Sequence, residues 1–128
     1  MVTLAGGCVC GDVRYSTDGA PLRITACHRA WCRRRTGSAF GVECVFPVEK
    51  VRVQGTALRS YRHHSDASGR WLERDFCSAC GSNIGLLLEA VPDIRSLSIG
   101  SFDDLWWMDS SRNGRRSSGC RSRRTMKK

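Results

Sequence analysis

The stretch Phe76-Cys77-Ser78-Ala79-Cys80-Gly81 contains two cysteines separated by two residues and followed by a glycine, which permits a tight turn. Such a turn directs both sulfurs to one point, where they can occupy two corners of a tetrahedral zinc site. Near the N-terminus, Gly7-Cys8-Val9-Cys10-Gly11 offers a second pair of thiols. We therefore predict one structural Zn²⁺ that joins distant parts of the chain and is bound by Cys8, Cys10, Cys77 and Cys80.

Disulfides are the alternative for these four cysteines. A C-x-x-C pair can form one, but a C-x-C pair is badly placed to bridge itself, and bridges between the two pairs require an oxidising compartment. Residues 1–7 lack a basic segment and a long apolar run, so we expect no secretory signal. No stretch reaches the length of a membrane span. We expect a cytoplasmic protein, in which reduced cysteines favour metal binding.

The composition suits one small domain with a charged extension. The chain has 128 residues, of which 41 % are hydrophobic, and its formal net charge is +9. Residues 106–128 hold eight of the 21 Lys/Arg residues but only one of the 12 acids. We expect a zinc-binding β domain over residues 1–105 and a basic, disordered tail over residues 106–128. The tail either binds nucleic acid electrostatically or results from a frame change and has no function.

Short apolar runs between glycines and prolines predict an all-β domain, either a sandwich or an open barrel-like sheet. At most, residues 29–35 make a short helical turn. Cys44 is expected in the core, because it lies on the apolar face of its strand. His63 and His64 are expected in a polar loop that faces solvent. The expected strands lie around residues 13–15, 22–26, 40–46, 51–53, 71–76, 84–88 and 97–99.

A second group of cysteines occurs in Cys27-His28-Arg29-Ala30-Trp31-Cys32, which is followed by Arg33, Arg34 and Arg35. Two thiols at this spacing can share a metal if a turn lies between them. Nearby positive charge lowers the pKa of a thiol, which suits metal binding or nucleophilic attack. Alternatively, Cys27 ends a core strand and the arginines form a solvated face. The spacing alone does not distinguish these possibilities.

The order of these motifs resembles the glutathione-dependent formaldehyde-activating enzyme family, which also contains centromere protein V. The resemblance covers about residues 6–104 and implies an all-β, Mss4-like fold. It implies that the first C-x-C and the last C-x-x-C bind structural zinc, and that a C-H-C-x-x-C motif binds a second, catalytic zinc. The implied activity is a carbon–sulfur lyase that forms or cleaves S-hydroxymethylglutathione. The motifs that carry the resemblance are Gly7-Cys8-x-Cys10-Gly11, Cys27-His28, Cys32-Arg33-Arg34-x-x-Gly37, Phe76-Cys77-x-x-Cys80-Gly81 and Gly100-Ser101-Phe102-Asp103-Asp104.

This sequence departs from the family motif at the second zinc site. Cys27 and Cys32 match the first and third catalytic cysteines, but Arg29 stands in place of the second. A guanidinium group cannot bind a metal, and a catalytic zinc normally has three protein ligands. We therefore expect an incomplete second site unless His28 or Cys44 supplies the third ligand.

The resemblance also suggests the substrate. Arg33 and Arg34 are the expected substrate-binding residues, because cationic side chains attract the carboxylates of glutathione. The first hypothesis is a zinc-dependent carbon–sulfur lyase, weakened by Arg29, that acts on a small thiol such as glutathione and an aldehyde. The second is a non-catalytic, zinc-stapled binding domain that contacts nucleic acid only through its tail.

Overall fold

The computed structural model describes residues 2–109. The tail expected over residues 106–128 therefore lies almost wholly outside the described residues. The elements are β1 (Thr3–Gly7), β2 (Arg14–Asp18), β3 (Arg23–Cys27), α1 (Ala30–Thr36), β4 (Gly41–Pro47), the 3-10 turn η1 (Val48–Lys50), β5 (Val51–Gln54), β6 (Leu58–His64), β7 (Trp71–Cys77), β8 (Asn83–Leu88), β9 (Ile94–Ser98), the 3-10 turn η2 (Ile99–Ser101) and α2 (Trp106–Asp109).

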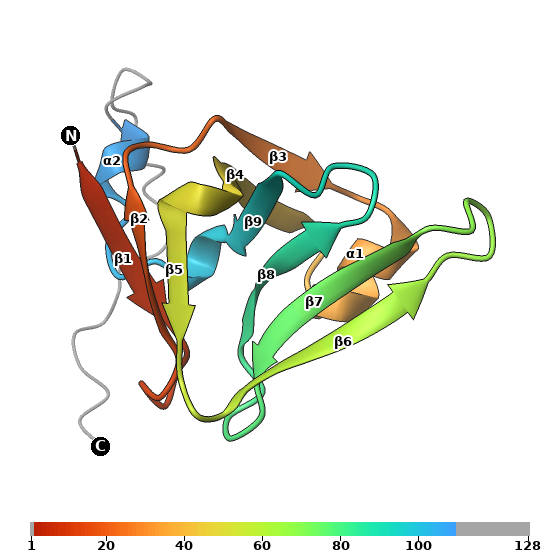
Figure 1. Ribbon diagram of the computed structural model, residues 1–128, viewed down its shortest axis with the longest axis horizontal. Coiled ribbons are helices and arrows are strands. Elements are labelled where there is room, and N and C mark those ends of the chain that lie inside the picture. Colours follow the sequence, from red (N-terminus) through yellow and green to blue (C-terminus); the bar gives the residue numbers. More distant parts are fainter. Residues whose placement is uncertain (1, 110–128) are drawn as a thin grey trace.

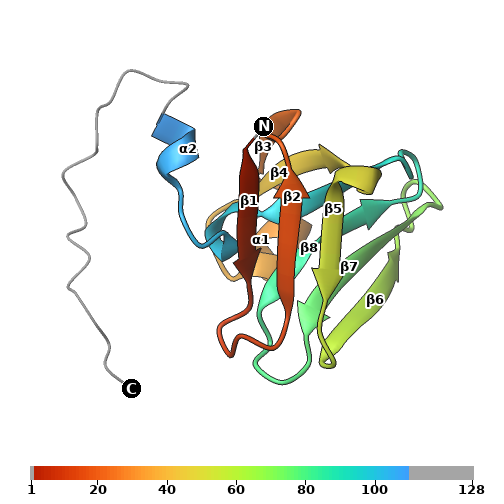
Figure 2. The ribbon, with the colours of Figure 1, turned by 60° about the vertical axis from the view of Figure 1, so that its left-hand side comes forward.

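The strands of the described part form two antiparallel sheets. β1, β2 and β5 make a three-stranded sheet, and the other strands follow the order β3-β4-β9-β8-β7-β6. The small sheet lies on the left of Figure 1. Figure 2 shows its three strands in front of the larger sheet. The predicted all-β class is confirmed.

The core lies between the two sheets. In β1 and β2 burial alternates from residue to residue, because successive side chains of a strand point to opposite faces. Cys44 is fully buried in this core, as predicted. The buried residues of the core cluster come from both sheets and from the loops that join their strands: Leu4, Cys8, Val13, Tyr15, Cys44, Phe46, Cys77, Ile84, Leu97 and Phe102.

β4 is buried on both of its faces. Cys44 and Phe46 belong to the core between the sheets. Glu43 and Val45 alternate with them and line a cavity on the other face of the strand. β4 therefore separates the apolar core from a second, more polar interior.

Strands β1 and β6 were not predicted from the sequence. β6 pairs with β7 over seven residues, and it ends with His63 and His64. The prediction that these histidines lie in a polar loop is therefore wrong. Most side chains of β6 are polar, so its sequence lacks the apolar alternation that marks a strand. His63 is also half-buried, with its ring 5.6 Å from that of Trp31.

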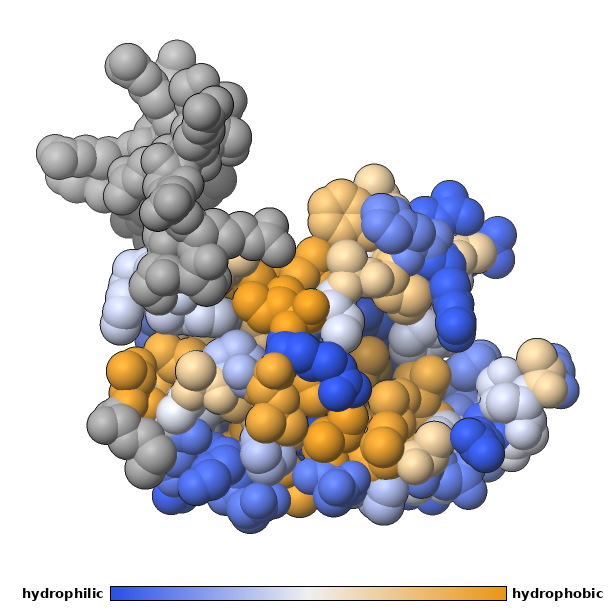
Figure 3. Space-filling model, turned by 90° about the horizontal axis from the view of Figure 1, so that it is seen from above, coloured by the Kyte–Doolittle hydropathy of each residue, from blue (hydrophilic) through white to orange (hydrophobic). Residues whose placement is uncertain are grey.

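β3 lies at the edge of the larger sheet and is exposed. Leu22, just before it, is 61 % exposed, and Ile24 is 43 % exposed. An edge strand has a neighbour on one side only, so alternation in this segment does not lead to burial. Figure 3, the view from above, shows apolar side chains gathered in the middle of this face of the molecule.

α1 follows β3 and matches the helical turn predicted for residues 29–35. It ends at Gly37, whose φ is 69° and whose N–H donates to Arg33 O at 2.8 Å. Three arginines occupy its last turn, where positive charge interacts favourably with the helix dipole. α1 therefore brings a dense positive charge close to Cys27, at the end of β3.

The C-terminal part of the described chain packs on the core. The Trp107 ring lies 5.1 Å from Phe102, so contacts with the β domain continue past residue 105. The domain boundary after residue 105 stays a prediction. No helix within residues 2–109 is long and apolar enough to cross a membrane.

Candidate metal centre and second thiol site

Two tight turns carry the first four cysteines. Between β1 and β2, the Gly11 N–H donates to Cys8 O at 3.2 Å, and between β7 and β8 the Gly81 N–H donates to Cys77 O at 2.7 Å. The φ angles of the two glycines are 84° and 77°, in the left-handed region that other residues rarely adopt. Each turn is thus closed by its glycine and presents its cysteines to the other turn.

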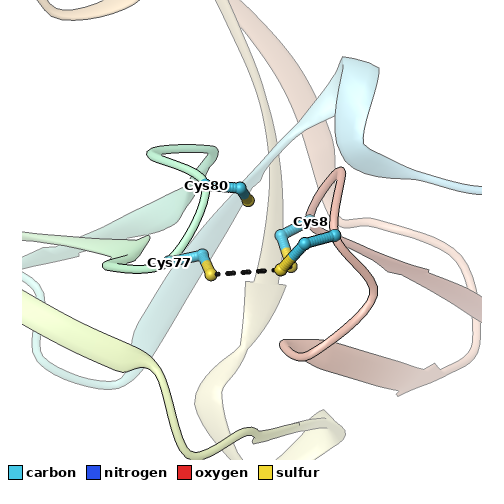
Figure 4. Close-up of side chains that lie close together, drawn as sticks. Cys8, Cys77 and Cys80 are labelled. Atoms are coloured by element: carbon cyan, nitrogen blue, oxygen red, sulfur yellow. Dashed lines mark hydrogen bonds between the residues drawn. The ribbon is translucent and has the colours of Figure 1, made fainter.

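The four sulfurs converge on one point, although 67 residues separate Cys10 from Cys77. Figure 4 shows Cys8, Cys77 and Cys80 pointing toward one another from the two turns. The Cys8 and Cys10 sulfurs are 3.5 Å apart, the Cys10 and Cys77 sulfurs 3.7 Å apart, and all four lie within 4.8 Å of one another. Tetrahedral coordination with Zn–S bonds of about 2.3 Å requires about 3.8 Å between sulfurs, whereas a disulfide requires about 2.05 Å.

This spacing fits a metal such as zinc and not a disulfide. Cys8 and Cys77 are buried, and Cys10 and Cys80 lie at the surface. Four thiols this close cannot all lose their protons without a nearby cation, because the resulting negative charges repel one another at such distances. The described residues therefore form a set of four ligands that could bind a metal ion such as zinc.

Ser82 connects the two turns. Its Oγ accepts a hydrogen bond from the Val9 N–H at 3.0 Å and lies 3.2 Å from the Cys80 sulfur. Hydrogen bonds from the Ser82 hydroxyl and N–H lower the pKa of Cys80 to about 5. At neutral pH, Cys80 is therefore ready to bind a metal as thiolate.

The second pair of cysteines lies on the other face of β4. Cys27 ends β3, Cys32 is buried in α1, and both line a cavity of about 160 Å³. A hydrogen bond with the Cys32 thiol lowers the pKa of Cys27, and the N–H and charge of Arg29 and the charge of Arg35 add to this effect. Burial, followed by Cys27, raises the pKa of Cys32. The two thiols therefore form a contacting pair with unequal acidity.

A third metal ligand does not lie beside this pair. Within residues 2–109, Cys8, Cys10, Cys77 and Cys80 form the only group of three or more potential ligands. Cys44 faces the core on the opposite side of β4, and burial raises its pKa to about 12. His28 is exposed, with its ring 5.3 Å from that of Phe40. Neither candidate for the third ligand completes the second site, so the residues present do not fit a catalytic zinc.

A buried ion pair occupies the same cavity. Arg35 Nη2 donates to Glu43 Oε1 at 2.8 Å, and the two side chains are only 3 % and 9 % exposed. Burial raises the pKa of Glu43, although Arg35 lowers it in part. Apolar side chains and Ser96 line the remainder of the cavity. The site thus combines two thiols, a buried cation and a buried carboxyl group.

The arginines predicted to bind substrate occupy different positions on α1. Arg34 lines a separate cavity, together with Arg35. Arg33 is exposed and takes part in no ion pair within residues 2–109. Sequence reasoning included Arg35 only as part of the basic run after Cys32, and it missed Glu43. Glu43 left a signal, because it is an acid between apolar residues in a strand.

Comparison with known proteins supports the resemblance noted in the sequence. The model of the family described as glutathione-dependent formaldehyde-activating enzyme matches residues 3–116. A crystal structure of a Rhodobacter sphaeroides protein has 19 % sequence identity and a TM-score of 0.63, and the match covers 84 % of this chain and 95 % of that chain. At this identity the similarity shows the fold alone. No curated protein matches the chain.

Both groups of cysteines lie inside the segment that the family model matches. The all-β, Mss4-like architecture agrees with that match and with the solved structure. The chain therefore belongs to the glutathione-dependent formaldehyde-activating enzyme family.

Proposed function

We propose that the protein is a carbon–sulfur lyase of this family, which forms or cleaves adducts between a small thiol such as glutathione and an aldehyde such as formaldehyde. The observation that most supports this proposal is the shared cavity of Cys27, Cys32, Arg35 and Glu43. It offers thiol chemistry, positive charge and a carboxyl group in one cavity. Arg33 and Arg34 supply positive charge that attracts the carboxylates of the thiol substrate.

The reaction is redox-neutral. The sulfur of the thiol forms a bond to the carbonyl carbon, and the proton lost from the thiol ends on the carbonyl oxygen. Positive charge from Arg29 and Arg35 favours a thiolate in the cavity. Glu43, whose pKa burial raises, is the group that we assign to exchange the proton with the oxygen.

Zinc is the metal that we propose for Cys8, Cys10, Cys77 and Cys80, because a tetrahedral set of four thiolates favours it. In this role it stabilises the fold and takes no part in the reaction. A catalytic zinc would hold the substrate thiol as thiolate or polarise the carbonyl. Because Cys27 and Cys32 supply only two of its three usual ligands, no step of the proposed reaction depends on a catalytic zinc, and we expect a weak activity.

A non-catalytic, zinc-stapled binding domain is the second candidate. The observation that favours it is the missing third ligand beside Cys27 and Cys32. Binding of nucleic acid through residues 110–128 would belong to this candidate and lies outside the described residues. Both candidates suit the cytoplasm, where free thiols stay reduced.

Metal content and catalysis together test the proposal. The adduct forms slowly without a catalyst, so activity is measured as faster NMR exchange between free and hydroxymethylated glutathione. We expect acceleration by the wild-type protein and its loss in Cys27→Ser. Zinc is counted by elemental analysis of protein purified without chelator. About one zinc per chain with no acceleration would favour the binding domain.

A further inference from the structure

A cavity of about 360 Å³ adjoins the thiol cavity and contains Arg34, which is expected to attract the substrate carboxylates. It is lined by Trp31, Arg34, Arg35, Tyr61 and Arg74. Arg35 also lines the cavity that contains Cys27 and Cys32. The two cavities are therefore neighbours that share one buried guanidinium group.

The local structure explains why these side chains meet. Trp31, Arg34 and Arg35 are spaced by three and four residues in α1, so they lie on one face of the helix. Tyr61 of β6 and Arg74 of β7 are paired directly across the sheet, so their side chains point to the same face. The cavity thus forms where one face of α1 meets the face of β6 and β7.

Several contacts hold the lining in place. The Arg35 guanidinium lies 5.4 Å from the centre of the Trp31 ring, which also packs against His63. Arg74 Nη2 donates to Asn83 Oδ1 at 2.5 Å, and Asn83 Nδ2 donates to Arg35 O at 3.3 Å. The aromatic face and two of the three guanidinium groups are therefore pre-positioned, which reduces the entropy that a ligand must lose on binding.

The cavity has more positive than negative charge. Of its three arginines, Arg35 alone has a carboxylate partner, Glu43, among the ion pairs within residues 2–109. The Nε atoms of Arg35 and Arg74 are buried and have no acceptor in this part of the chain. Burial, followed by the charge of Arg35, lowers the pKa of Arg74. A negatively charged ligand in the cavity would relieve this repulsion.

We propose that this cavity binds a carboxylate group of the thiol substrate, in a proposal that rests on the lyase function. Guanidinium groups bind carboxylates in a planar, two-bonded geometry, and Trp31 and Tyr61 offer flat faces to the peptide groups of the ligand. An extended tripeptide is about 10 Å long. A tripeptide thiol such as glutathione has a carboxylate at each end and its sulfur on the central residue. One of its carboxylates can therefore lie in this cavity while the sulfur reaches past Arg35 toward Cys27.

The test uses S-methylglutathione, which keeps both carboxylates but has no free thiol, and the zinc-loaded full chain. Binding is measured by calorimetry and by the NMR shift of the Trp31 indole N–H, assigned with Trp31→Phe. Arg34→Gln and Arg74→Met should each raise the Kd about tenfold or more, as loss of a hydrogen bond to a charged group predicts. The control Arg62→Gln changes an arginine that follows Tyr61 in β6 and points to the opposite face, and it should leave the Kd unchanged.

Esterification of both carboxylates should abolish binding. Equal Kd values in Arg34→Gln, Arg62→Gln and wild type, or no binding of S-methylglutathione to wild type, would overturn the proposal. If the Arg74→Met variant loses zinc or its β-sheet circular dichroism signal, the proposal is tested by the exposed Arg34 alone, through the comparison of Arg34→Gln with Arg62→Gln. S-methylglutathione could bind with the expected Kd values for the variants while the exchange between glutathione and formaldehyde is not accelerated. In that case the proposed lyase function is wrong, and the proposed carboxylate site is supported.

Discussion

The two groups of cysteines differ in what balances the negative charge of their thiolates. Around Cys8, Cys10, Cys77 and Cys80 the sulfurs have neutral hydrogen-bond partners such as the Val13 N–H and the Ser82 hydroxyl, and four sulfurs lie within 4.8 Å of one another. Around Cys27 and Cys32, guanidinium groups supply positive charge beside only two sulfurs. Thiolates in the first group therefore need a metal for charge balance, whereas arginines already supply part of that balance in the second.

The first prediction tests this contrast with single Cys→Ser changes. Cys77→Ser should unfold the domain, because structural zinc contributes about 10–16 kcal/mol of apparent binding energy and net stability is only about 5–15 kcal/mol. Cys27→Ser should keep the fold and the structural zinc. Thermal melting by circular dichroism and elemental zinc analysis measure both effects. A Cys77→Ser protein that melts like its parent would show that a metal does not close the fold.

The second prediction concerns the ion pair beside Cys27 and Cys32. Glu43→Gln leaves Arg35 as a buried charge without a partner, which should lower the free energy of unfolding by about 3–5 kcal/mol. The double change Arg35→Met with Glu43→Leu should cost much less, because it removes both charges. Urea denaturation measures these differences.

A surface pair provides the control for that measurement. Arg52 pairs with Asp18 at 2.8 Å but is 66 % exposed, so Arg52→Met should lower the free energy of unfolding far less than Glu43→Gln does. If Glu43→Gln costs no more than Arg52→Met, the pair beside the thiols is not electrostatically important.

The third prediction changes the composition of the second group. Arg29→Cys removes a positive charge and adds a third thiol, so zinc content should rise from about one toward two per chain. Acceleration of the glutathione–formaldehyde exchange should rise with it, and Cys27→Ser in the same background should abolish both gains. Wild-type protein that already contains two zinc ions would contradict our description of the second group.

The smallest expected effect concerns the turn that holds Cys8 and Cys10. The Ala57 N–H and the Thr56 hydroxyl donate to Asp12 and hold its pKa below the usual 3.8. A lowered carboxyl pKa stabilises the fold above the unfolded-state value and loses this effect as pH falls through the folded-state value. Asp12→Asn should therefore lower the Tm slightly and by the same amount at pH 7 and pH 5. A difference that shrinks between these two pH values would contradict the shift.

The sequence pattern predicted the strands that have an apolar face. It did not predict the strands that form only because a neighbouring strand offers hydrogen bonds. β1 consists largely of small residues and glycines, and β6 carries mostly polar side chains. Neither has an apolar alternation, so each is a strand because its neighbour offers hydrogen bonds. In β3 the pattern was present but burial was absent, because position at a sheet edge depends on the whole topology.

The candidate sites show the same limit. Spacing and glycines were enough to find Cys77 and Cys80, because that geometry is local to one turn. Glu43 and Arg74 meet α1 only through the folded sheet, so sequence proximity could not reveal them. Motifs with a recognisable ligand spacing were therefore predictable even where two distant motifs meet, as in the group of Cys8, Cys10, Cys77 and Cys80. Single residues that meet across strands were not.

The long separation of Cys10 from Cys77 affects how the protein is made. A ribosome that adds about 5–20 residues per second needs about 3 to 13 s to add the 67 residues that follow Cys10 up to and including Cys77. During that interval Cys8 and Cys10 are on an unfinished chain without their two partners. We expect the nascent protein to be most sensitive to oxidants and to zinc supply in these seconds, well before the finished protein becomes resistant to both.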